Sequence, residues 1–244
     1  MDNNILILGL QYAGYVLEVV LFVLLAKHGK LHRLTAMCLY VVGLFLTDGV
    51  ARPAVLHYFG ISSTQYFNFY WVTDVMLALG QFLLIGAFFR RACLREEKMW
   101  RFARLVLVFA FILVCVVSAL FITRNYSQLI TGFIIEFSQN LYFTCLVLNT
   151  LLFVMIQQFS IEDDELGMLV CGIGIQFAGE AACLAFLHLS LNDNFSRALL
   201  TFLGPACTLG MLSVWIYAVS KPSEPVSIRL PGKGEAALAE VLAD

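Results

Sequence analysis

Charged residues are scarce in this sequence. Aspartate, glutamate, lysine and arginine make up 13% of its 244 residues, against about 25% in a typical soluble domain. Apolar residues make up 61%, and the mean hydropathy is +0.86. Such a chain has too little polar surface to cover a water-soluble globule. Its formal net charge of -2 gives no sign of a nucleic-acid partner.

Several signatures of catalysis and cofactor binding are also missing. The sequence has no Gly-x-Ser-x-Gly elbow, no Cys-x-x-Cys pair and no phosphate-binding loop. The last apolar segment has no lysine that could hold retinal, and Asp48 and Asp74 lack the Gly-x-Gly-Asp pattern of intramembrane aspartyl proteases. His57 and His188 lie near segment ends and are too few for a zinc hydrolase. We therefore expect no enzyme activity, no metal and no cofactor.

What the sequence does contain is long apolar runs. A helix that crosses a bilayer needs about 20 such residues. We predict an all-α membrane protein with a seven-transmembrane-helix bundle in residues 1–220 and a short tail in residues 221–244. The expected helices are 5–26, 34–58, 67–89, 105–122, 129–157, 166–189 and 197–220. The second is interrupted by Asp48, Arg52 and Pro53.

Lysine and arginine in short loops predict which way the bundle faces. The connection after the first helix holds three of them, the basic loop that runs from Arg90 to Arg104 holds six, and the tail holds three. The opposite connections hold only Arg124 and Arg197. We therefore expect the N-terminus outside and the C-terminus in the cytoplasm. The acidic residues 162–165 depart from the pattern, but acids contribute little to orientation.

Ionisable side chains within the predicted helices are the candidate functional residues, because they are costly in hydrocarbon and usually face the bundle interior. The acids are Glu18, Asp48, Asp74, Glu136 and Glu180, and the one cation is Arg52. Asp48 and Arg52 are four residues apart and can pair. Because five carboxylates surround one arginine, they cannot all stay ionised unless a cation joins them.

Helix spacing brings polar neighbours onto the same faces as these acids. Gln176 shares a face with Glu180, and Gln139 shares one with Glu136. At about 1.5 Å of rise per residue, Asp48 and Glu180 lie within roughly 5 Å of the midplane. On the sixth helix, Gly174, Ala178 and Ala182 are four residues apart, which predicts close packing against a neighbour.

Two motifs give a loose resemblance to a known group. They are the run YFNFYWVTD from Tyr66 to Asp74, followed by the basic loop, and the sequence WIY at 215–217 followed by Lys221 and Pro222. In these motifs the chain resembles a family of small bacterial seven-helix membrane proteins that have no assigned activity. In topology alone, it also resembles the seven-helix sensory domains that precede bacterial signalling modules, although it lacks an output module. The resemblance implies a multi-pass protein of the bacterial inner membrane.

Together these patterns favour a sensor or receptor-like protein with an outward-facing acidic pocket. The expected ligand is a small cation, and the expected cytoplasmic protein partner binds at the basic loop from Arg90 to Arg104. A proton- or cation-coupled transporter and an accessory subunit of a larger membrane complex remain as alternatives. The predicted pocket residues are Asp48, Arg52, Tyr70, Trp71, Asp74, Glu136, Gln139, Gln176 and Glu180.

Overall fold

The computed structural model describes residues 2–60, 63–94, 97–122, 129–158, 163–189 and 194–221, and within these ranges it contains helices and no strand. The elements are α1 (Asp2–Lys27), α2 (Thr35–Leu44), the π-helix η1 (Phe45–Ala51), α3 (Arg52–Phe59), α4 (Thr64–Ala92), α5 (Glu97–Ile122), α6 (Leu129–Gln158), α7 (Asp164–Leu189) and α8 (Asn194–Ser220).

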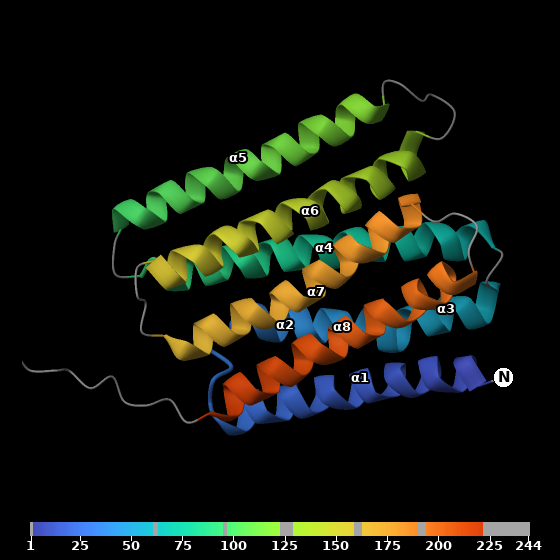
Figure 1. Cartoon of the computed structure of the whole chain (residues 1–244), viewed down its shortest axis with the longest axis horizontal. Coiled ribbons are helices and arrows are strands. Elements are labelled where there is room, and N and C mark those ends of the chain that lie inside the picture. Colours follow the sequence, from blue (N-terminus) through green and yellow to red (C-terminus); the bar gives the residue numbers. More distant parts are fainter. Residues whose placement is uncertain are drawn as a thin grey trace, which may run out of the picture.

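Seven spans in the described part of the chain are long and apolar enough to cross a membrane. In this count α2, η1 and α3 form one span, Thr35–Phe59. Successive spans run in opposite directions, so the start of α1 and the end of α8 lie at opposite ends of the bundle (Figure 1). The prediction of an all-helical multi-pass membrane protein is confirmed at this level.

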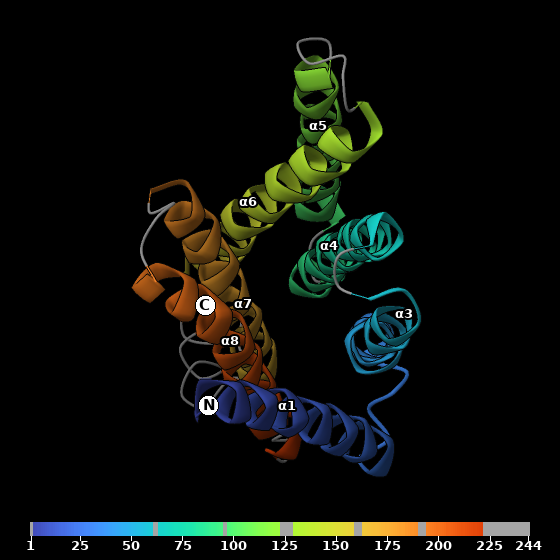
Figure 2. The ribbon, with the colours of Figure 1, turned by 90° about the vertical axis from the view of Figure 1, so that its right-hand side faces the viewer.

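Six of the spans surround the interior, and α5 lies at one edge (Figure 2). α5 packs on α6 and, less closely, on α4. Large apolar side chains of α5, such as Phe102, Leu105 and Phe109, are exposed along its outer surface. An exposed apolar surface of this size fits contact with lipid.

The basic connection from Arg90 to Arg104 is mostly helical rather than a loop. α4 continues to Ala92, and α5 begins at Glu97 instead of at residue 105. The charged residues Lys98 and Arg101 therefore extend α5 beyond its apolar stretch. The sequence predicted a later start for α5 because the apolar run alone begins near residue 105.

The interruption predicted in the second span is the π-helix η1. At its end the Arg52 N–H donates to the Thr47 carbonyl, which is a bond over five residues. Pro53 has no N–H to donate. The Asp48 carbonyl is thus left without a partner in its own helix, and the Tyr15 hydroxyl of α1 donates to it at 2.8 Å. An interhelical hydrogen bond satisfies the carbonyl that the helix break exposes.

The closest helix packing joins α7 to α8. A Cβ added at Gly172 would lie 2.7 Å from two ring atoms of Trp215, whose side chain is fully buried. The Trp215 indole also donates to the Leu169 carbonyl at 2.9 Å. The small-residue ridge predicted on this helix packs closely only in part. A Cβ on Gly174 would lie 2.9 Å from Asn149 Nδ2 of α6, whereas Ala178 is exposed.

Candidate functional site

The first polar cluster forms around Arg52, at the start of α3. Its Nη1 atom lies 2.6 Å from Asp48 Oδ1, and its Nη2 atom lies 3.8 Å from Asp74 Oδ1 on α4. Its Nε donates to Thr73 Oγ1 at 3.1 Å, and the guanidinium carbon lies 4.2 Å from the centre of the Tyr70 ring. Arg52 directly follows the π-helix and its guanidinium reaches α4, so one cation contacts two carboxylates and an aromatic face.

Asp74 extends this cluster to α6. The Ser138 hydroxyl donates to Asp74 Oδ2, and the Tyr142 hydroxyl donates to Asp74 Oδ1 at 3.1 Å. With Arg52 close to Oδ1 as well, both carboxylate oxygens of Asp74 have partners. We call these residues the arginine cluster: Asp48, Arg52, Tyr70, Thr73, Asp74, Ser138 and Tyr142.

A second cluster surrounds Glu180 on α7. Glu180 Oε1 accepts from Gln176 Nε2 at 2.8 Å and from Gln81 Nε2 at 3.3 Å. Gln81 Nε2 also donates to the Tyr40 hydroxyl at 3.0 Å, and Thr208 of α8 donates to Gln176 Oε1 at 3.0 Å. We call these five residues the glutamate cluster. It joins α2, α4, α7 and α8 through side chains alone.

Some buried oxygens of this region have no hydrogen-bond partner. Among the described residues they include Glu180 Oε2, Gln81 Oε1 and Glu18 Oε2. Glu18, on α1, is 3% exposed and interacts electrostatically with Asp48. A buried carboxylate oxygen without a partner is costly. Arg52 is already engaged, so these acids have room for a proton or a further cation.

The structure brings most of the predicted pocket residues together. Asp48, Arg52, Tyr70 and Asp74 lie in the arginine cluster, and Gln176 and Glu180 lie in the glutamate cluster. The predicted pair of Asp48 with Arg52 and the shared face of Gln176 with Glu180 are both present.

Three predicted pocket residues lie beside the clusters. The Trp71 ring packs on the rings of Tyr70 and Phe67, with centroids 5.6 Å and 6.1 Å away. Glu136 and Gln139 of α6 are half-buried, and within the described ranges neither bonds to either cluster. These ranges also contain no group of three or more histidine, cysteine or acidic side chains that could hold a metal ion.

Sequence reasoning missed the hydroxyl groups of the two clusters. Tyr40, Ser138, Tyr142 and Thr208 donate or accept hydrogen bonds there. Their only signal was spacing, since Ser138 and Tyr142 are four residues apart and share a face of α6. Such residues are common in membrane helices, where they bond to the backbone as well, so spacing alone did not separate them from others.

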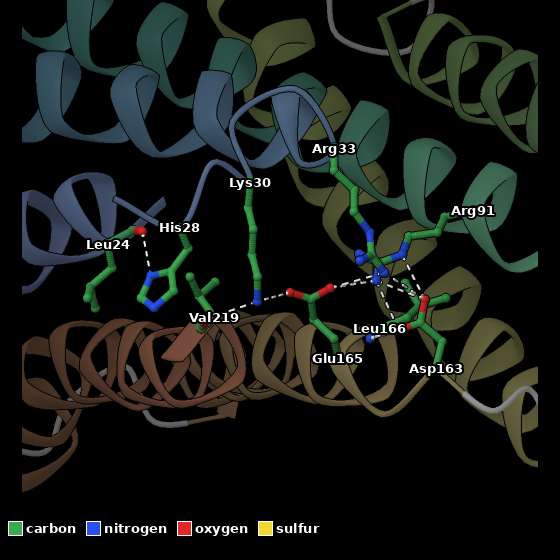
Figure 3. Close-up of polar contacts among 9 residues, drawn as sticks. All are labelled: Leu24, His28, Lys30, Arg33, Arg91, Asp163, Glu165, Leu166 and Val219. Carbon is green, nitrogen blue, oxygen red and sulfur yellow. Dashed lines mark hydrogen bonds and ion pairs between the residues drawn. The ribbon is translucent and has the colours of Figure 1, made fainter. Parts of the chain in front are cut away.

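A network of ion pairs lies at the end of the bundle where α4 ends and α7 begins (Figure 3). Arg91 binds Asp163 through two nitrogens at 2.9 Å each and lies 2.7 Å from Glu165. Lys30 lies 2.8 Å from the other oxygen of Glu165, and Arg33 lies 3.3 Å from Glu165. We call these five residues the ion-pair clamp.

The clamp ties together segments that are far apart in the sequence. Lys30 follows α1, Arg91 closes α4, and Asp163 precedes α7 and accepts a hydrogen bond from the Leu166 N–H. Lys30 also donates to the Val219 carbonyl near the end of α8, at 3.0 Å. Asp163 and Glu165, two of the acids that departed from the charge pattern, therefore serve as counter-charges of the basic residues at this end.

A groove of about 470 Å³ opens beside the clamp, between the end of α6 and the start of α7. Its walls combine apolar and acidic side chains: Phe153, Ile156, Gln157, Asp163, Asp164, Gly167 and Met168. The end of the bundle that carries the basic residues is therefore also hollowed at its surface.

Comparisons with protein-family models, with curated proteins and with solved structures find no match to this chain.

Proposed function

We propose that this protein is a receptor-like membrane sensor, which binds a small cationic ligand in its interior and signals through a cytoplasmic partner. The role is one of binding rather than catalysis. The ligand site comprises the arginine and glutamate clusters together with Glu18.

One observation carries the proposal: buried acids in this interior outnumber the cation. Arg52 already contacts Asp48 and Asp74, whereas Glu18 Oε2 and Glu180 Oε2 are buried without a partner. Groups that serve only to join helices are usually satisfied by their neighbours. Unsatisfied carboxylate oxygens in hydrocarbon are instead typical of a site that is completed by a proton or a ligand.

A coupled transporter is the second candidate. The packing between the glutamate cluster and the ion-pair clamp favours it less. A transport path needs polar groups across the whole membrane. Between the glutamate cluster and the ion-pair clamp, the buried side chains include Met37, Leu84, Leu169 and Trp215. Asn149 is a buried polar residue of this layer, and its Nδ2 donates to a backbone carbonyl of α7.

The orientation is part of the proposal: the N-terminus lies outside, and the clamp faces the cytoplasm of a bacterial cell. The basic residues at one end support it. A reporter that is active only in the cytoplasm, fused after Asp244, should be active, and the same reporter inserted near Ser62 should be silent. The reverse pattern would overturn the orientation.

The proposed partner surface is the exposed remainder of the basic segment. Arg91 is engaged in the clamp, whereas Arg90, Lys98 and Arg104 are exposed. Exposed side chains of one sign can steer an acidic partner at little cost to the fold. Reversing these three charges should abolish co-purification of the partner and leave the unfolding temperature unchanged.

Ligand binding is tested by thermal unfolding of the purified protein against a panel of amines and inorganic cations. A ligand that binds only the folded state raises the unfolding midpoint with its concentration. The Glu180→Gln variant should lose that shift, while Glu97→Gln, a change in an exposed acid of α5, should keep it. The same shift in both variants, or no shift with any cation, would contradict the proposal.

A further inference from the structure

The seam between α1 and η1 has features that the two clusters do not explain. Tyr15 of α1 contacts η1 twice: its hydroxyl donates to the Asp48 carbonyl, and its ring packs at 6.3 Å on that of Phe45. The Tyr12 ring packs edge-on against Tyr15 at 6.2 Å. The three aromatic rings thus pack one against the next, the middle one is bonded to the Asp48 backbone, and Glu18 lies one turn further along α1.

This seam opens sideways rather than into the bundle. The outer half of α1 leans toward α8 and away from α3 (Figure 2). The Asp48 side chain is 33% exposed although it lies near the middle of its span, and Tyr12 is 61% exposed. Val16, four residues from Tyr12 on the same face of α1, is equally exposed. An exposed apolar face meets lipid, so the seam lies open beside the bilayer.

The charges of the seam favour a cationic occupant. Asp48 is paired with Arg52, but the neighbouring carboxylate of Glu18 is buried with one oxygen unpartnered. Aromatic rings such as Tyr12 and Tyr15 attract an ammonium group to their faces. The exposed apolar residues beside them, including Val16, suit an alkyl chain rather than water.

We propose that the seam formed by Tyr12, Tyr15, Glu18, Phe45 and Asp48 is a lateral binding site for an amphiphilic ammonium compound taken up from the lipid phase. The ammonium group contacts Glu18 and the tyrosine rings, and the alkyl chain lies along the exposed faces of α1 and η1. This inference rests on the proposed function and deepens it, because it names the class of ligand and the route by which that ligand reaches the interior.

The test uses the full chain in nanodiscs of zwitterionic phosphatidylcholine, with dodecyltrimethylammonium as the probe. Two compounds separate charge from chain: tetramethylammonium has the charge alone, and dodecanol has the chain alone. Dodecyltrimethylammonium should raise the unfolding midpoint in a saturable manner, and the other two should not. Glu18→Gln should weaken its apparent affinity by about tenfold or more, as expected for loss of a charge-assisted contact.

Matched variants keep the test decisive if Glu18→Gln folds poorly. Tyr12→Ala removes an exposed ring and should weaken binding several-fold while the protein still folds. Phe102→Ala removes a similarly exposed ring from α5, away from the seam, and should have no effect.

Each other outcome overturns the inference in a recognisable way. Equal shifts in the wild type, Glu18→Gln and Tyr12→Ala would mean simple partitioning into the bilayer. A saturable shift with tetramethylammonium alone would leave the proposed function intact and exclude the lateral route. No shift with either ammonium compound would contradict the lateral site, and the panel of amines and inorganic cations would still decide the proposed function. A dimer in the nanodisc that Tyr12→Ala separates would assign the seam to a second copy of the chain.

Discussion

At the scale of single residues, Arg52 is the side chain that joins the acids of the arginine cluster. Its guanidinium contacts Asp48, Thr73 and Asp74 and lies over the Tyr70 ring. Removing one partner of a buried ion pair strands the other and costs about 3–5 kcal/mol. Arg52→Ala should therefore lower the free energy of unfolding by about 3 kcal/mol, and Arg52→Lys by less, because lysine lacks the planar fork.

A double-mutant cycle in detergent measures this effect. Arg52→Ala combined with Asp48→Asn should recover part of the loss, since the stranded charge is removed with its partner. Arg101→Ala is the matched control, because Arg101 pairs with Glu97 at the same i,i+4 spacing but both side chains are largely exposed. If Arg52→Ala were as mild as Arg101→Ala and additive with Asp48→Asn, Arg52 would be reaching the lipid headgroups instead.

Arg91 and Arg90 form a natural comparison because they are adjacent in the sequence. Arg91 is 11% exposed and binds two acids of the ion-pair clamp, whereas Arg90 is exposed. Arg91→Ala should lower the free energy of unfolding by about 3 kcal/mol, and Arg90→Ala should hardly change it. Equal unfolding midpoints for the two variants would show that the clamp contributes nothing.

At this scale the sequence predicted only contacts between residues that are close along the chain. Arg52 was paired correctly with Asp48 because four residues along a helix fix their proximity. The clamp was missed because its partners, such as Lys30 and Glu165, are separated by 135 positions, and no periodicity connects them. The bonds from Ser138 and Tyr142 to Asp74 depend likewise on how α4 and α6 pack.

At the scale of elements, the π-helix and α1 depend on each other. Tyr15→Phe leaves the Asp48 carbonyl without a donor and should cost about 1 kcal/mol. Pro53→Ala supplies a new backbone N–H at a position that can reach this carbonyl. In the Pro53→Ala background, Tyr15→Phe should therefore cost less.

The measurement is reversible unfolding of the two single variants and the double variant, with Tyr12→Phe as the control for removing an exposed hydroxyl. Strict additivity of Tyr15→Phe and Pro53→Ala would disconnect Tyr15 from the helix break. The sequence indicated a break in the second span from Pro53, but not that α1 supplies the missing donor.

The packing of α7 on α8 gives the second test at this scale. A methyl group at Gly172 would collide with the Trp215 ring and lie 3.3 Å from the Met211 carbonyl oxygen, so Gly172→Ala should cost about 1–3 kcal/mol. A Cβ at Gly167, in the same helix, would meet no atom within 4 Å. Gly167→Ala should therefore be neutral or slightly stabilising, through helix propensity. Equal effects of the two variants on the unfolding midpoint would contradict the packing.

At the scale of the whole molecule, the seven spans were predictable and their mutual arrangement was not. The length and apolarity of a span are local properties, and they recovered all seven. Which faces meet is decided by packing between distant segments. The sequence therefore grouped Glu136 and Gln139 with the pocket. Within the described ranges, neither side chain forms a hydrogen bond to either cluster. It predicted close packing along Gly174, Ala178 and Ala182, but did not identify the contact between Gly172 and Trp215.

The central claim is that the buried acids form a site for a ligand rather than contacts between helices, and Glu180 tests it most directly. Glu180 Oε1 accepts two hydrogen bonds that a glutamine carbonyl can also accept, and Oε2 has no partner. The decisive measurement is the free energy of unfolding of Glu180→Gln against the wild type, without ligand. A ligand site is strained when empty, so the account predicts that Glu180→Gln is at least as stable as the wild type. A loss of more than about 1 kcal/mol would make Glu180 a structural contact and contradict the account.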